Sequence, residues 1–318
     1  MPRTDNDSWD ITTSVGRTAL GVAAFRAAET AKPHPLFRDP FAQLFLDAAG
    51  ETGGHVSIES GEAELGDASR NNAIAAQSRT WRRVIGEYTA CRTAFFDEFF
   101  VTATEEGIRQ AVILAAGLDA RAWRLPWPDG TTVYEIDQPA VLEFKSATLR
   151  SSSAEPTCTH IAMPIDLRHD WPTALQQAGF DPALASAWSA EGLLPYLPAQ
   201  AQDLLFDRIQ VLSAAGSRLA VEALPIDFPH SEQSRRDQTR RLRETAERLG
   251  RTDLLQNFEE LWYYQERTDL AEWLRSHQWD VSVVASDQLL TNYQRAGADD
   301  IADALPGSRF MTARRTSR

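Results

Sequence analysis

The sequence is poor in cysteine, in net positive charge and in long apolar runs, and each shortage excludes a class of protein. Only two cysteines, Cys91 and Cys158, occur in 318 residues. Two distant cysteines make neither a disulfide framework nor a zinc motif, so we expect a protein of a reducing compartment, with no metal. The formal net charge is -13, and such a charge repels phosphate backbones. Nucleic acid is therefore not an expected partner, although RRDQTRRLR (235–243) leaves a local basic patch open.

Membrane segments are lacking as well. No stretch approaches the roughly 18 apolar residues that a membrane-spanning helix needs. The first ten residues, MPRTDNDSWD, show no signal-peptide pattern. We therefore expect a cytoplasmic protein with no membrane partner. Hydrophobic residues make up 43% of the chain, which is enough for a sizeable core in one large domain.

Short apolar runs alternate with helical segments through the middle of the chain. The runs are AVILAA (111–116), TTVYEID (131–137), CTHIAMPID (158–166), ALASAWSAEG (183–192) and SRLAVEAL (217–224). Apolar periodicity predicts helices over 78–100 and over 198–216, with Gly216 ending the second. This alternation predicts an α/β fold, in which a parallel sheet has helices on both faces. WDVSVVAS (279–286) and SRFMTARR (308–315) are expected to close the sheet as antiparallel strands.

Residues suited to ligand binding follow four of these runs, namely Gly117, Asp137, Asp166 and Glu191-Gly192. Ligands of doubly wound sheets bind beyond the carboxyl ends of the strands. Gly117 can bring its backbone close to a ligand because it has no Cβ. Asp137 follows it by 20 residues, the interval at which nucleotide-binding folds place an acid on ribose hydroxyls. Asp166, one strand further, is suitably placed to accept a hydrogen bond from an amine such as that of adenine.

Each of these residues also has a purely structural explanation. A lone glycine after an apolar run is commonly a turn residue, and an aspartate at a strand end is an ordinary helix N-cap. Asp119 and Arg121 could form a surface ion pair, which would contribute little stability. The stretch AAGLDAR lacks the G-x-G-x-x-G spacing of a dinucleotide site. An NAD-dependent oxidoreductase and a non-catalytic cofactor-binding protein stay open as alternative functions.

Eight blocks of sequence follow one another along the chain. They are WDITTSVGRTALGVAAFRAAET (9–30), PLFRDPFA (35–42), RTAFFDEFF (92–100), VILAAGLDARAWRL (112–125), VYEIDQPAVLEFK (133–145), DLRHDWPTAL (166–175), GFDPALASAWSAEGLLPYLP (179–198) and RLAVEALP (218–225). In this order they resemble the actinobacterial S-adenosyl-L-methionine-dependent methyltransferases related to leucine carboxyl methyltransferases. The resemblance implies a Rossmann-like class I methyltransferase fold. Its sheet would be mostly parallel and seven-stranded, with an N-terminal helical cap and a helical insertion before the last strands.

The resemblance also implies how the cofactor's nucleoside would be held. Ala116 and Gly117 would pass beneath the methionyl part of S-adenosyl-L-methionine. Asp137 would bind the ribose hydroxyls, and Asp166 with Leu167 would bracket the adenine. The turn is less rich in glycine than in many methyltransferases, so its backbone has less freedom.

Two residues would contact the methionine end of the cofactor. Arg92 would pair with the carboxylate, which suits a guanidinium fork, and Glu191 would lie near the amino group. A solvated helix position for Arg92 and a capping role for Glu191 are the alternatives. No catalytic residue is assigned, because His34 and His169 are more simply surface or packing residues.

We predict a single methyltransferase domain over 1–318, made of a helical cap at 8–100, a cofactor-binding core at 101–225, a helical insertion or lid at 226–278, and closing strands with a tail at 279–318. Within the insertion, LWYY (261–264) could line an apolar substrate pocket or belong to the core. The predicted reaction transfers a methyl group from S-adenosyl-L-methionine to a carboxylate or hydroxyl of a small metabolite.

Overall fold

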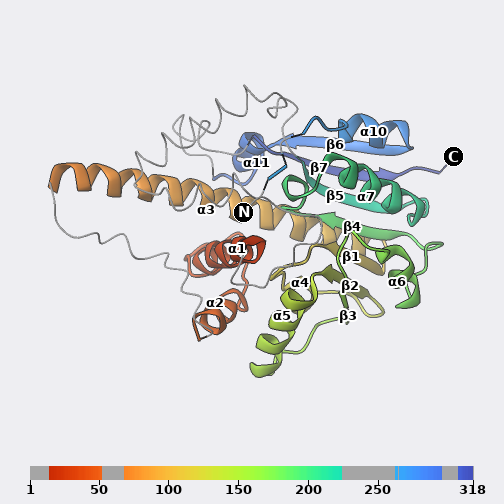
Figure 1. The fold of residues 1–318 in the computed structure, drawn as a ribbon, viewed down its shortest axis with the longest axis horizontal. Coiled ribbons are helices and arrows are strands. Elements are labelled where there is room, and N and C mark those ends of the chain that lie inside the picture. The colour runs from red at the N-terminus through yellow and green to blue at the C-terminus, as the bar shows by residue number, and fades with distance from the viewer. Residues whose placement is uncertain (1–13, 52–67, 224–261, 264, 296–306, 318) are drawn as a thin grey trace.

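A seven-stranded sheet forms the centre of the computed structural model, which describes residues 14–51, 68–223, 262–263, 265–295 and 307–317 (Figure 1). The strands are β1 (Gln110–Leu114), β2 (Thr132–Asp137), β3 (Thr159–Pro164), β4 (Ser186–Ala190), β5 (Arg218–Ala223), β6 (Trp279–Ala285) and β7 (Arg309–Arg315). Their order is β3-β2-β1-β4-β5-β7-β6. Neighbours among β1 to β5 pair in parallel, whereas β7 is antiparallel to both β5 and β6. The predicted mostly parallel seven-stranded sheet is confirmed.

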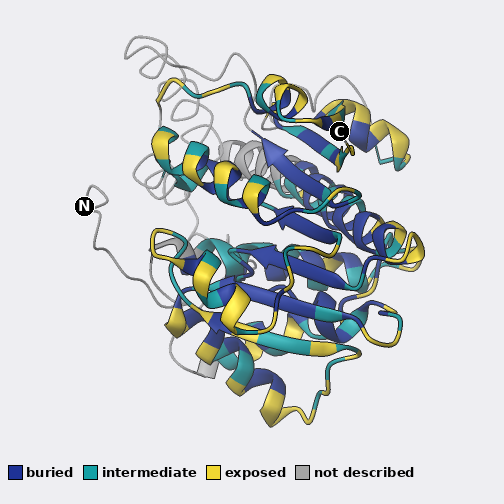
Figure 2. Cartoon of the chain, turned by 90° about the vertical axis from the view of Figure 1, so that its right-hand side faces the viewer, coloured by how far each residue is buried: buried dark blue, intermediate teal, exposed yellow. Residues whose placement is uncertain are grey.

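Helices cover both faces of this sheet, and the strands β1, β2, β4 and β5 are largely buried between them (Figure 2). They are α1 (Ser14–Thr30), α2 (Ala42–Glu51), α3 (Ala68–Glu105), α4 (Arg121–Arg124), α5 (Pro139–Ser151), α6 (Trp171–Gln177), the 3-10 helix η1 (Leu194–Tyr196), α7 (Ala199–Val211), α10 (Leu270–Ser276) and α11 (Ser286–Asn292). Successive strand residues point to opposite faces. In β1, Ala111 and Ile113 accordingly join one hydrophobic cluster, and Val112 and Leu114 join another.

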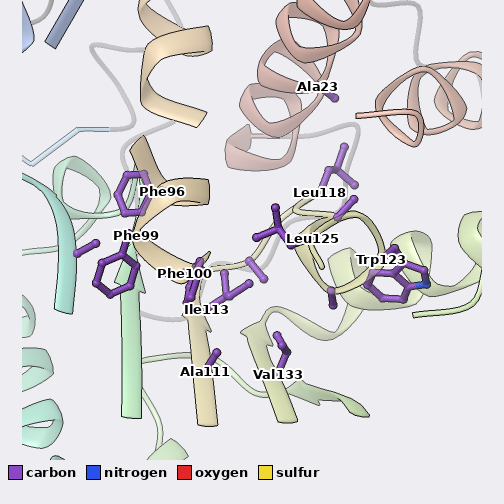
Figure 3. Packing of buried hydrophobic residues seen from close by; sticks show 14 of the residues in the cluster. Ala23, Phe96, Phe99, Phe100, Ala111, Ile113, Leu118, Trp123, Leu125 and Val133 are labelled. Atoms are coloured by element: carbon purple, nitrogen blue, oxygen red, sulfur yellow. The ribbon is translucent and has the colours of Figure 1, made fainter. Parts of the chain in front are cut away.

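The first cluster lies between the sheet and the helices of the N-terminal half. Phe96, Phe99 and Phe100 of α3 point toward β1 and its neighbours (Figure 3). Ala23 of α1 and Leu118 belong to the same cluster, so α1 packs over the loop that leaves β1 (Figure 3). The second cluster joins the other face of the sheet to α6, α7 and α10.

Strand positions agree with the sequence prediction, but one predicted helix end was wrong. Helix α7 ends at Val211, well before Gly216. Its last turn is closed by the Leu212 N–H, which donates to the Arg208 carbonyl, and by the Ser213 hydroxyl, which donates to the Ile209 carbonyl. Gly216 has a φ of +86° and lies in the turn that enters β5. It therefore serves the turn and not the helix terminus.

Residues 226–261 of the predicted insertion lie outside the described residues, and with them the basic stretch 235–243. Helix α10, which falls in the same predicted segment, packs through Leu270 and Leu274 into the second cluster. Among the described helices, none is long and apolar enough to cross a membrane. The same residues contain no group of His, Cys, Asp or Glu side chains that could hold a metal ion.

Candidate functional site

The carboxyl ends of β1, β2 and β4 lie at one level of the sheet, because Leu114 pairs with both Ile136 and Ala190. Beyond β1 the chain turns sharply. Ala115 and Gly117 have φ values of +52° and +50°, in the left-handed region that favours glycine. The Gly117 N–H donates to Asp137 Oδ2 at 2.6 Å. A Cβ at position 117 would lie 3.6 Å from the Ala19 Cβ, so α1 closes over the turn.

Asp137 ends β2 and is only partly buried. Besides the Gly117 N–H, it accepts the N–H of Gln138 on Oδ1 at 2.6 Å. Burial raises the pKa of the Asp137 carboxyl above its ordinary value, and the two backbone hydrogen bonds oppose that rise. Each carboxylate oxygen has more than one lone pair. Asp137 can therefore still accept a hydrogen bond from a hydroxyl group of a ligand.

Asp166 is tied to the same corner through Gln138, whose side-chain amide donates to Asp166 Oδ2. Arg168 also holds Asp166, through its backbone N–H at 2.8 Å and its Nε at 2.9 Å. Partial burial opposes ionisation of Asp166, but these hydrogen bonds outweigh it and lower the pKa. Leu167 is half-buried and packs against the second cluster. Gln138 was not singled out from the sequence, although its position directly after YEID could have drawn notice.

Arg92 and Glu191 are in direct contact, with Arg92 Nε 3.0 Å from Glu191 Oε1. A third residue, Glu222 at the end of β5, lies 3.1 Å from Arg92 Nη1 through its Oε2. Glu222 also accepts the Tyr88 hydroxyl and the Gly192 N–H, the latter at 2.8 Å. Arg92 is mostly buried, so the solvated-helix alternative does not hold. Sequence reasoning missed Glu222, whose only signal was a charged residue inside an apolar run.

Glu191 belongs to a larger charge network built around Arg121. This arginine is 2% exposed, and its guanidinium contacts Asp97 at 2.7 Å, Glu191 at 2.8 Å and Asp119. Arg124 makes a two-pronged contact with Asp97, with both distances 2.6 Å. Asp119 is itself 6% exposed. The surface ion pair considered for Asp119 and Arg121 is therefore wrong, because both groups are buried inside a multi-member network.

A second buried pair supports the turn from below. Lys145 Nζ lies 2.6 Å from Glu135 Oε2 and donates to the Asp119 carbonyl at 2.9 Å. The side chains of Lys145 and Glu135 are 1% and 0% exposed. His160 Nε2 lies 2.8 Å from the same Glu135 oxygen. Since Asp119 leaves the β1 turn and Glu135 lies two residues before Asp137, this pair fixes the turn relative to β2.

Helix α1 is fastened to the turn by a buried arginine. Arg26 Nη2 donates to the Leu118 carbonyl at 2.6 Å, and its Nε lies 3.0 Å from Asp39 Oδ2. Beyond Glu191, the 3-10 helix η1 carries Tyr196, which hydrogen-bonds to Trp262. Of LWYY (261–264), the structure describes Trp262 and Tyr263, and both are half-buried.

The structure thus gathers the predicted residues at one sheet edge. Gly117, Asp137 and Asp166 lie on the β1–β3 side, and Arg92 and Glu191 on the β4–β5 side. His34 and His169 are both exposed.

The sequence itself relates this arrangement to known proteins. The profile of the family described as leucine carboxyl methyltransferase matches residues 19–210. The chain belongs to this family. A relative from Mycobacterium avium (strain 104) is 54% identical over 98% of both chains. One from Mycobacterium ulcerans (strain Agy99) is 52% identical over 99% of this chain and all of the other. Both carry the name "Putative S-adenosyl-L-methionine-dependent methyltransferase".

Family membership confirms the prediction of an S-adenosyl-L-methionine-dependent methyltransferase and argues against an NAD-dependent oxidoreductase. The fold has a solved counterpart in a DUF574 family protein from Streptomyces avermitilis. The superposition covers 85% of this methyltransferase and 96% of the Streptomyces chain, with a TM-score of 0.51 and 14% sequence identity. At this identity the likeness concerns the fold alone, a Rossmann-like α/β sheet.

Proposed function

We propose that S-adenosyl-L-methionine binds across the carboxyl ends of β1 to β4, with its nucleoside on the β2–β3 side. Gly117 lines the turn, where its φ of +50° lies in the left-handed region that favours glycine. Asp137 would accept the ribose hydroxyls on its remaining lone pairs, and Asp166 with Leu167 would flank the adenine. Ala116, whose N–H donates to the Ile136 carbonyl at 3.1 Å, keeps the turn joined to β2.

The methionine end would lie at Arg92 and Glu191. The Arg92 Nε is buried and makes no hydrogen bond to the described residues, although Glu191 lies within ion-pair distance. Burial opposes the charge of Arg92, but Glu222 and Glu191 outweigh that effect and raise its pKa, so Arg92 stays charged. A guanidinium next to a carboxylate matches the carboxylate and ammonium groups of an amino acid. These donors and acceptors fit the proposed cofactor.

We further propose that the methyl acceptor is an oxygen of a small molecule, with a carboxylate favoured over a hydroxyl. The supporting observation is that the acidic side chains at the β4–β5 edge are already paired with arginines: Glu191 with Arg92 and Arg121, and Glu222 with Arg92. A paired carboxylate is a weak general base. A carboxylate acceptor is ionised at neutral pH and needs no base, whereas a hydroxyl must lose its proton. The description of the family as carboxyl methyltransferases agrees with this choice.

The reaction then depends mainly on alignment. The bound cofactor supplies a methyl group on a positively charged sulfur. An oxygen lone pair of the acceptor would form the new C–O bond, while the C–S bond would break and leave its electron pair on sulfur. Holding the two reactants in line can supply on the order of 7–11 kcal/mol of the barrier reduction. The chain would contribute the fixed turn after β1, the Asp137 carboxylate that accepts the ribose hydroxyls, and the buried charge network.

A transfer assay with methyl-labelled S-adenosyl-L-methionine tests the proposal on a panel of carboxylic acids, phenols and amines. A methyl ester releases methanol in mild alkali, whereas methyl ethers and methylamines do not. We expect label in a base-labile product, and loss of transfer in Asp137→Ala. Transfer to amines alone would contradict the choice of oxygen. A cytoplasmic location and the absence of a nucleic-acid partner also stay proposals.

A further inference from the structure

The charge network at the β4–β5 edge contains one more carboxylate than cation. Three arginines face four carboxylates there: Arg92, Arg121 and Arg124 against Asp97, Asp119, Glu191 and Glu222. The neighbouring cations each have a carboxylate partner of their own, since Arg26 is paired with Asp39 and Lys145 with Glu135. Among the described residues, one negative charge is therefore left over in this largely buried network.

The surplus charge is best assigned to Glu222. Asp97, Asp119 and Glu191 all contact Arg121, and Asp97 also contacts Arg124. Glu222 shares only Arg92, which Glu191 also contacts, and its remaining donors are the neutral Tyr88 hydroxyl and Gly192 N–H. At 8% exposure it is poorly screened by solvent. Desolvation, followed by the negative charge of Glu222, raises the pKa of Tyr88, so the phenol stays a neutral donor.

Methyl transfer changes the charge of the cofactor by one unit. S-adenosyl-L-methionine carries a positive sulfonium, whereas the product S-adenosylhomocysteine has a neutral thioether in its place. The amino-acid and adenosine groups are the same in both. A charge at the site therefore distinguishes reactant from product only through its interaction with the sulfur.

From this balance we infer that Glu222 is a specificity-determining residue, which makes the site prefer the positively charged sulfonium cofactor over the neutral thioether product. The inference rests on the cofactor placement proposed above, with the methionine end at Arg92 and Glu191. Glu222 lies at the end of β5, the strand next to β4, and neighbouring strands are about 4.8 Å apart. A partly buried charge at such separations acts on the sulfonium with little screening. The consequence is easier release of product after each turnover.

Glu222→Gln tests the inference because the two side chains have nearly the same shape. The glutamine carbonyl can accept from Arg92 and from the Gly192 N–H, while its amide donates to the Tyr88 oxygen. Calorimetry on the full chain would measure Kd for S-adenosyl-L-methionine, S-adenosylhomocysteine and sinefungin, which carries a protonated amine near the sulfur position. We expect the Kd of S-adenosylhomocysteine divided by the Kd of S-adenosyl-L-methionine to fall about fivefold. The Kd of sinefungin should change in the same way as that of S-adenosyl-L-methionine.

Two matched variants complete the design. Glu106→Gln removes the same charge from the exposed pair with Arg218, at the opposite end of β5 and about 13 Å away along the strand. It should leave the Kd ratio unchanged. Glu222→Asp keeps the charge and should hold the ratio within about twofold of the wild-type value, even where both affinities fall.

The inference would be overturned by a Glu222→Gln ratio equal to that of the wild type. If all three ligands were also weakened equally, Glu222 would be a purely structural support. Asp137→Ala separates this failure from that of the site itself. If Asp137→Ala weakens every ligand while Glu222→Gln leaves the ratio unchanged, only the inference fails. If Asp137→Ala changes none of the affinities, the proposed placement fails first.

Discussion

The two sides of the same sheet edge hold their carboxylates in opposite ways. On the β2–β3 side, Asp137 accepts backbone N–H groups, and Asp166 accepts an amide and the partly exposed Arg168. On the β4–β5 side, Glu191 and Glu222 are held by mostly buried arginines. The neutral donors of Asp137 orient that carboxylate without cancelling its charge, whereas the arginines of the β4–β5 side cancel the carboxylate charges there, apart from the one surplus charge assigned to Glu222.

This difference separates carboxylates that keep free lone pairs from carboxylates that belong to a buried ion network. A carboxylate with spare lone pairs and some exposure can exchange water for a ligand hydroxyl at low cost. A buried ion network cannot lose one member without leaving other charges unpaired in a medium that solvates them poorly. Substitutions on the two sides should therefore have different signatures. Those on the β2–β3 side should affect mainly affinity, whereas those that break the β4–β5 network should also lower stability.

The largest effect is expected from Arg121→Met. The substitution leaves the charges of Asp97, Asp119 and Glu191 with too few cations, all of them mostly buried. Breaking a buried pair in this way costs about 3–5 kcal/mol of unfolding free energy. Denaturant unfolding followed by circular dichroism would measure it.

An exposed pair on the same framework serves as the control for Arg121→Met. Glu106 is the exposed partner of Arg218, and Glu106→Gln should change the unfolding free energy by less than about 1 kcal/mol. If Arg121→Met were equally mild, the network would not be the stabilising element proposed for the β4–β5 side.

Next in size is the effect of Asp137→Ala on binding. The change removes an acceptor that we assign to two ribose hydroxyls, so S-adenosyl-L-methionine should bind at least about tenfold more weakly. Stability should fall much less than in Arg121→Met, because Asp137 forms no ion pair with the residues that the structure describes. Calorimetric titration beside a thermal melt would measure both quantities. Unchanged affinity would show that a different acid holds the ribose.

The fold was predictable because buried strands have apolar sequences that are easily recognised. The β1 run consists of apolar residues on both faces of the sheet, and its strand is buried at every position. Asp137 was predictable for a similar reason, since a strand end at a fixed interval after Gly117 is a property of the local chain. Arg92 and Glu191 came from family resemblance, and the sequence alone did not place them in contact.

The buried charge network was not predictable, because it joins residues far apart in the chain. Tyr88 and Glu222 are 134 positions apart, and nothing in either segment signals the other. Lys145 reads as an ordinary polar position of a helix, yet it is buried against Glu135. A charged residue in a run of apolar ones, as in YEID or LAVEAL, is the single local sign of such pairing.

The two aspartates on the β2–β3 side should differ in their response to acid. Burial raises the pKa of Asp137, whereas hydrogen bonds lower that of Asp166 against the effect of its partial burial. As the pH falls, Asp137 is therefore protonated first, above the ordinary aspartate range. A bound diol stabilises the ionised carboxylate, so protonation should weaken cofactor binding, by at most about tenfold per pH unit.

Titrations of S-adenosyl-L-methionine from neutral to mildly acidic pH would follow this loss of affinity. Asp137→Asn should bind weakly throughout and remove most of the pH dependence. A wild-type profile that stays flat until the ordinary aspartate range would assign the titration to some other group.

The smallest effect is expected from Ala115→Gly, in the turn that joins the two sides. Ala115 has a φ of +52°, a conformation that costs an L-residue roughly 1–2 kcal/mol. Glycine relieves this strain but gains freedom in the unfolded chain, which costs roughly 0.5–1 kcal/mol. The two effects oppose each other, so the unfolding free energy should rise by only about 0 to 1.5 kcal/mol.

The neighbouring residue gives the matched comparison for this turn. Ala116 is buried, and its φ is not positive. Ala116→Gly thus gains no relief of strain and should be the more destabilising of the two, by about 1 kcal/mol. Denaturant unfolding of both variants, run side by side, measures the difference directly. Equal destabilisation would mean that the left-handed turn at Ala115 carries no strain, and that its shape is set wholly by the hydrogen bond from Gly117 to Asp137.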